Sequence, residues 1–202
     1  FRLGIEPYFF SHSKTDNPQK NYAKILEYFV ALGSVIFLSV VVFADVLKPF
    51  IIRSEAYYEA MWIVPFILLA NFCLGIYHNL SVWYKITDRT KYGAYISILG
   101  AITTLVLNVV LIPIIGFKGS AIATLSAYLI MMLLSFYFGK KHYPIPYNLK
   151  KIGAYLSVSI VFSFVFFYNY RENYIIGIAM LIVFLGLVIS LEKKELKQVL
   201  KR

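Results

Sequence analysis

Few polar side chains in this sequence lie where they could do chemistry, and the best placed fall inside a long apolar run. Asn71, His78 and Asn79 interrupt residues 60–84, a stretch without Asp, Glu, Lys or Arg. Asn71 and His78 are seven residues apart and share a helix face, and Pro65 can kink the outer half of this helix. Polar groups deep in a bilayer face a bundle interior or a wet cavity. The three side chains are therefore candidates for a polar substrate cavity, with hydrogen bonds between helices as the structural alternative.

A second candidate lies at the start of the chain. Arg2 and Glu6 are four residues apart in an otherwise apolar segment. They can pair with each other on one helix face. They can also line a cavity, where Arg2 would meet an anionic substrate. Both residues are therefore candidates for lining a substrate cavity.

A short basic turn follows the run that contains His78. Lys85, Arg89 and Lys91 are opposed by Asp88 alone. Such a turn orients a membrane protein and attracts anionic lipid. A secondary role is to gather a lipid pyrophosphate at the inner leaflet.

Signatures of an enzyme do not occur in the sequence. It has no His, Cys, Asp or Glu cluster at metal spacing, no nucleophile elbow and no glycine-rich phosphate loop. Its single cysteine, Cys73, cannot form an internal disulfide. We expect no enzymatic activity, no metal ion and no cofactor.

The elements that must position these residues are helices in lipid. Hydrophobic residues make up 60% of the chain and charged residues only 15%, whereas soluble domains carry about 25% charged residues. A helix of about 20 apolar residues spans the hydrocarbon core. The strands of a membrane barrel alternate apolar and polar residues, whereas these runs are apolar at both odd and even positions. The sequence predicts an all-α, polytopic membrane helix bundle with six transmembrane helices, preceded by the end of an earlier one, in a single transmembrane region over residues 1–202. The six helices are expected at residues 25–47, 60–84, 92–113, 119–139, 152–170 and 173–191.

Basic residues alternate between the connecting segments. Residues 11–24, 85–91, 140–151 and 193–202 hold 3, 3, 4 and 5 Lys and Arg, whereas residues 45–59, 114–118 and 169–173 hold 2, 1 and 1. The positive-inside rule puts the richer set in the cytoplasm, so the C-terminus is predicted to be cytoplasmic. This placement explains the net charge of +10 and argues against nucleic-acid binding.

Small residues recur at helical spacing in two of the predicted helices. They allow close approach of helix backbones in lipid, so we expect both stripes to serve helix packing. The stripes are Gly93, Ser97 and Ala101, and Gly119, Ala123 and Ala127.

Two segments carry a family resemblance. One is the run from Phe1 to Phe10 with the basic loop after it. The other extends from Tyr92 through Asn108, Pro113 and Gly116 to the run Gly119-Ser120-Ala121-Ile122-Ala123-Thr124. Together they resemble the C-terminal portion of the O-antigen and polysaccharide flippases of the multidrug/oligosaccharidyl-lipid/polysaccharide exporter superfamily.

The resemblance implies a larger fold of roughly 12 to 14 helices in two lobes around a central cavity. The chain would be the latter part of such a protein, with the N-terminal lobe as its missing partner, in the inner membrane of a bacterium. The implied activity moves an undecaprenyl-pyrophosphate-linked oligosaccharide between leaflets for surface polysaccharide synthesis. Among the cavity cations of the family, only Arg2 matches one.

Two other functions remain open. A drug or small-solute antiporter of the same superfamily would need an acidic residue in the middle of a helix, and Glu27 and Asp45 lie too near predicted helix ends to serve well. A membrane polysaccharide polymerase would need a large outer loop with catalytic residues, and the predicted outer loops are short.

Overall fold

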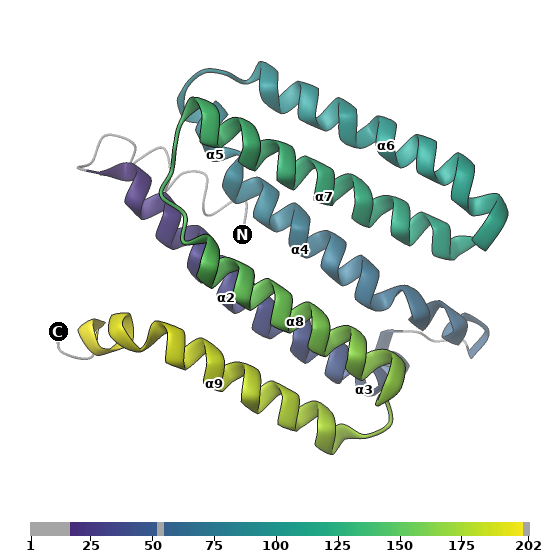
Figure 1. The fold of residues 1–202 in the computed structure, drawn as a ribbon. Helices are drawn as coiled ribbons and strands as arrows, with labels where there is room; N and C mark the ends of the chain where they lie inside the picture. The colour runs from purple at the N-terminus through teal and green to yellow at the C-terminus, as the bar shows by residue number, and fades with distance from the viewer. Residues whose placement is uncertain (1–16, 52–54, 200–202) are drawn as a thin grey trace. The chain divides into compact units, whose positions relative to one another are not determined.

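The computed structural model describes residues 17–51 and 55–199, and these ranges contain helices and no strand. Within them, six helical segments are long and apolar enough to cross a membrane (Figure 1). The predicted all-α membrane bundle is therefore confirmed. The segments are Pro18–Val42, Tyr58–Ile86, Lys91–Ile115, Phe117–His142, Leu149–Asn169 and Tyr174–Lys193.

The first helix begins and ends earlier than the sequence predicts. α2 (Pro18–Val42) includes Lys20 and Lys24, and a separate helix α3 (Ala44–Ile51) follows the turn at Phe43. Pro18 occupies the first helical position, where its missing N–H and fixed φ are tolerated. Hydropathy marks only the apolar part of a helix, so the charged first turns of α2 lie outside the predicted range of residues 25–47.

The second predicted helix is divided into three pieces. A 3₁₀ helix η1 (Glu55–Ile63) leads into α4 (Val64–Leu80), and α5 (Val82–Ile86) continues after Ser81. Pro65 lies in the first turn of α4, where a proline interrupts no helical hydrogen bond. The kink predicted at Pro65 is thus a change from 3₁₀ to α-helical winding at the start of α4.

The described part of the chain forms two compact units. Among the described residues, unit 1 comprises residues 17–29 and Trp62–Tyr147, and unit 2 comprises residues 30–51, 55–61 and 148–199. In unit 1, α7 (Phe117–His142) packs against both α4 and α6 (Lys91–Ile115), as Figure 1 shows.

The connection between α6 and α7 is a tight turn at Gly116, which has φ +62°. Glycine adopts this backbone conformation without steric cost. Three residues later, Gly119 lies against the other helix, and a Cβ built on it would lie 2.8 Å from the backbone carbon of Leu111. The two helices therefore form a close antiparallel hairpin.

In unit 2, α8 (Leu149–Asn169) and α9 (Tyr174–Val199) pack with the second half of α2. The shared core consists of Leu38, Val42, Phe166, Leu181 and Phe184. Large apolar side chains from three helices interlock here.

Candidate functional site

The polar residues of α4 have different surroundings. Asn71 is exposed, His78 is half-buried and Asn79 is only 3% exposed. The Asn71 Nδ2 donates to the Ile67 carbonyl at 2.8 Å, and the Asn79 Nδ2 donates to the Gly75 carbonyl at 3.0 Å. Both amides thus donate within their own helix, which lowers the cost of placing them in an apolar medium. The Asn79 Oδ1 is buried without a hydrogen-bond partner among the described residues, so Asn79 has an acceptor left inside unit 1.

The predicted basic turn belongs to a larger group of cations at one end of unit 1. The end of α5 and the start of α6 adjoin the end of α7, because α6 and α7 are antiparallel neighbours. The first turns of α2 reach the same end through a small apolar cluster built on Tyr22 and Val82. We call this group the basic end, and it consists of Lys20, Lys24, Lys85, Arg89, Lys91, Lys140 and Lys141.

An aromatic cluster of Trp83, Tyr92 and His142 lies at the same end of unit 1. The His142 ring stacks on Trp83, with centroids 5.6 Å apart and planes at 8°. His142 Nε2 lies 3.0 Å from the Tyr92 hydroxyl, and His142 Nδ1 lies 3.0 Å from the Phe138 carbonyl. A carbonyl can only accept, so Nδ1 carries a hydrogen and donates it to Phe138.

Glycines allow these rings to approach the helices closely. A Cβ on Gly139 would lie 2.9 Å from Trp83 Cδ1, and a Cβ on Gly93 would lie 2.8 Å from Tyr84 Cε2. The Trp83 indole also donates to the Ser135 carbonyl at 3.2 Å. Beyond α7, the Tyr143 and Tyr147 phenols are neutral at pH 7, as tyrosines ordinarily are, and do not offset the cations; burial raises the pKa of both further.

The basic end thus combines aromatic rings with Lys and Arg, as is typical of a membrane interface. Rings with polar edges favour the boundary between acyl chains and head groups, and Lys and Arg side chains there can meet lipid phosphates. In the part of the chain that the structure describes, no group of His, Cys, Asp or Glu is placed to hold a metal ion. The basic end can therefore hold phosphate groups by charge and hydrogen bonding.

The two small-residue stripes are placed differently. Gly119, Ala123 and Ala127 are all buried in unit 1. On α6, Gly93 is buried, whereas Ser97 and Ala101 are exposed. The buried positions of α6 are Gly93, Ile96 and Gly100. The face of α6 that packs in unit 1 therefore follows a spacing of three and then four residues, whereas the predicted stripe has a spacing of four. Arg2 and Glu6 lie outside the described residues.

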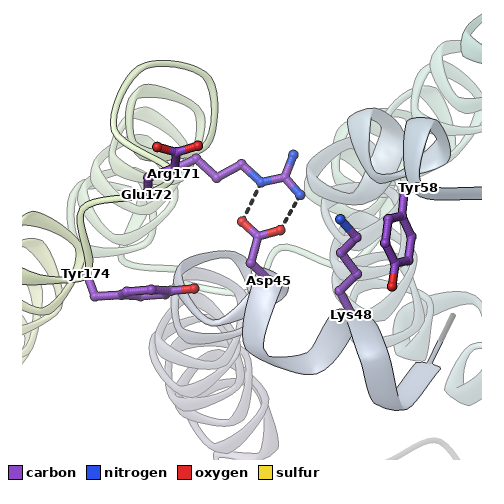
Figure 2. A pocket seen from close by; sticks show the side chains of 6 residues that line it. All are labelled: Asp45, Lys48, Tyr58, Arg171, Glu172 and Tyr174. Atoms are coloured by element: carbon purple, nitrogen blue, oxygen red, sulfur yellow. Dashed lines mark hydrogen bonds and ion pairs between the residues drawn. The ribbon is translucent and has the colours of Figure 1, made fainter. Parts of the chain in front are cut away.

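Sequence reasoning missed a polar pocket of about 390 Å³ in unit 2. Arg171, in the turn between α8 and α9, forms a two-pronged ion pair with Asp45 of α3, with both N···O distances 2.5 Å. Lys48 and Tyr58 lie on one side of this pair, and Glu172 and Tyr174 lie on the other (Figure 2). In the sequence, these residues show only as charges near the ends of apolar runs, where they count as loop charges.

The six apolar helical segments define a multi-pass helical membrane protein. Comparison with family models, with curated proteins and with solved structures gives no match.

Proposed function

We propose that this chain belongs to a flippase that moves a lipid-linked oligosaccharide, carried on undecaprenyl pyrophosphate, across the inner membrane of a bacterium. The observation that carries the proposal is the basic end of unit 1, where cations from four helical segments gather at the same end as an aromatic cluster. A lipid pyrophosphate is a concentrated anion on a membrane anchor, so a cationic rim at head-group depth suits its capture.

Two further features support the proposal. The segments around Asn108, Pro113 and Gly119 resemble those of polysaccharide flippases, and α4 carries polar side chains at Asn71, His78 and Asn79 within its apolar run. Moving a substrate between leaflets needs a polar path and two states of the protein rather than bond chemistry. The basic end would face the cytoplasm, where the substrate is assembled.

The test is the leaflet distribution of the lipid-linked oligosaccharide. Cells without the full-length gene should accumulate the unpolymerised intermediate on the cytoplasmic leaflet, measured by its access to a membrane-impermeant reagent in vesicles of known orientation. Unchanged export of surface glycan in these cells would reject the flippase function.

Within this assay, replacing Lys85, Arg89 and Lys91 together by Gln should slow transport by about tenfold. Each cation near the surface contributes about 1 kcal/mol of attraction to anionic lipid, and the remaining cations of the basic end compensate for part of the loss. Lys118→Gln serves as the matched control, since Lys118 lies outside the basic end and contacts the Trp62 ring at 5.0 Å. A triple variant that transports at the control rate would show that the basic end does not gather substrate.

Arg2 gives an independent prediction. If Arg2 meets the anionic part of the substrate in the cavity, Arg2→Ala should strongly impair glycan export and Arg2→Lys should retain part of it, because Lys keeps the charge but loses the bidentate geometry. Protein abundance in the membrane, measured by immunoblot, separates this result from poor folding. Normal export by Arg2→Ala would remove Arg2 from the cavity.

A further inference from the structure

The pocket of unit 2 contains a cation and an anion beyond the Asp45–Arg171 pair. Lys48 is half-buried, and its Nζ lies 3.5 Å from the centroid of the Tyr58 ring. Glu172 is exposed at the opposite wall. Among the side chains that the structure describes, neither Lys48 nor Glu172 forms an ion pair. The pocket therefore offers separate positive and negative binding positions.

The Asp45–Arg171 pair adds hydrogen-bond donors between these positions. Arg171 uses Nε and Nη2 to hold the two carboxylate oxygens of Asp45. A guanidinium has five N–H donors, so three remain after these two bonds. Arg171 also lies 4.5 Å from the centroid of the Phe167 ring, which supports the guanidinium plane from one face. The donors are held in place and are available to an oxyanion.

The position of the pocket along the chain places it at head-group depth. One span ends at Asn169 and the next begins at Tyr174, and Arg171 and Glu172 fall between them. Asp45 and Lys48 follow the end of the α2 span at Val42. Tyr58 and Tyr174 supply aromatic walls, as expected where acyl chains meet head groups. The ligand that is most abundant at this depth is the head group of a phospholipid.

We propose that this pocket binds the phosphoethanolamine head group of a membrane phospholipid, with the phosphate between Lys48 and Arg171 and the ammonium at Glu172. The formal charges of Asp45, Lys48, Arg171 and Glu172 cancel, so a zwitterion matches the pocket better than an anion does. A volume of about 390 Å³ is within the range of small-ligand sites. An ammonium can donate hydrogen bonds to a carboxylate, whereas the trimethylammonium of choline cannot. The proposal is independent of the flippase function.

The test compares lipids that share acyl chains and differ in head group. The full-length protein, purified in detergent, is titrated separately with phosphatidylethanolamine, phosphatidylglycerol and phosphatidylcholine, and bound lipid is counted by native mass spectrometry. Phosphatidylethanolamine should bind about tenfold more tightly than either of the others, as expected for one charge-assisted hydrogen bond. Equal binding of all three lipids would overturn the proposal.

Two variants should change the lipid preference in different ways. Glu172→Gln removes the partner of the ammonium but keeps both cations, so the preference should shift toward phosphatidylglycerol. Lys48→Gln removes a partner of the phosphate and should weaken the binding of both phosphatidylethanolamine and phosphatidylglycerol. Lys118→Gln, which removes a cation near an aromatic ring in unit 1, should leave the relative affinities for the three lipids unchanged. A purely structural role of Glu172 would change the melting temperature without changing the ratio of the two lipids, and that outcome would contradict the proposal.

A last arm distinguishes a lipid from a soluble phosphoester. Glycerophosphoethanolamine has the same head group without acyl chains, and it should compete only at about a hundredfold higher concentration, because it lacks the apolar contacts of the chains. Competition at equal concentration would assign the pocket to a soluble ligand and would overturn the lipid assignment.

Discussion

Gly119→Ala should destabilise unit 1 by about 2 kcal/mol, although it adds a single methyl group. The Cβ would lie 2.8 Å from the backbone carbon and 2.9 Å from the backbone oxygen of Leu111. Backbone atoms of a packed helix cannot rotate away as a side-chain end can, so α6 and α7 must separate. The measurement is the unfolding free energy of the purified protein in mixed micelles, titrated with a denaturing detergent.

Gly153→Ala is the matched control for this experiment. Gly153 lies in α8, and a Cβ built there has nothing within 4 Å. Alanine is favoured over glycine inside a helix by about 0.5–1 kcal/mol, so this variant should be neutral or slightly stabilised. If Gly119→Ala were as stable as Gly153→Ala, the close approach of α6 and α7 at Leu111 would be refuted.

Lys151→Met should destabilise unit 2 by about 3 kcal/mol, because it removes a cation that lies directly against a buried carboxylate. Lys151 Nζ lies 3.2 Å from both oxygens of Glu192, and the Tyr155 hydroxyl donates to Glu192 Oε1 at 2.6 Å. The two charged side chains are 19% and 9% exposed, so water screens the pair only weakly. The same unfolding titration measures the effect.

Lys150→Met controls for the loss of one positive charge. Lys150 precedes Lys151 and is exposed, so its replacement should change stability by less than about 0.5 kcal/mol. The double variant Lys151→Met with Glu192→Met should regain much of the stability, since two apolar residues often replace a buried ion pair at little cost. A double variant no more stable than Lys151→Met alone would show that the ion pair is not the source of the loss.

The helices could be predicted from the sequence because a long apolar run has few other solutions in lipid. Their ends could not, because charged first turns such as Lys20 and Lys24 belong to the helix but not to the apolar run. The division of residues 55–86 into η1, α4 and α5 depends on local backbone choices around Pro65 and Ser81, to which a hydropathy pattern is insensitive.

The candidate sites were predictable to different degrees. Lys85, Arg89 and Lys91 are close in sequence, so the basic turn could be recognised directly. Asp45 and Arg171 are 126 residues apart, and no local pattern indicates that they meet. The spacing of Pro113, Gly116 and Gly119 has a direct explanation in the turn between α6 and α7, where it shapes the backbone.

The hairpin of α6 and α7 also bears on how this chain can change over evolutionary time. Most of α6 is turned away from the rest of unit 1, so one aliphatic residue can replace another there with little consequence. Gly116 and Gly119 admit almost no substitute, because one needs a left-handed backbone and the other has no room for a methyl group. Homologous sequences should therefore vary at most positions of α6 and retain glycine at the two positions of the turn.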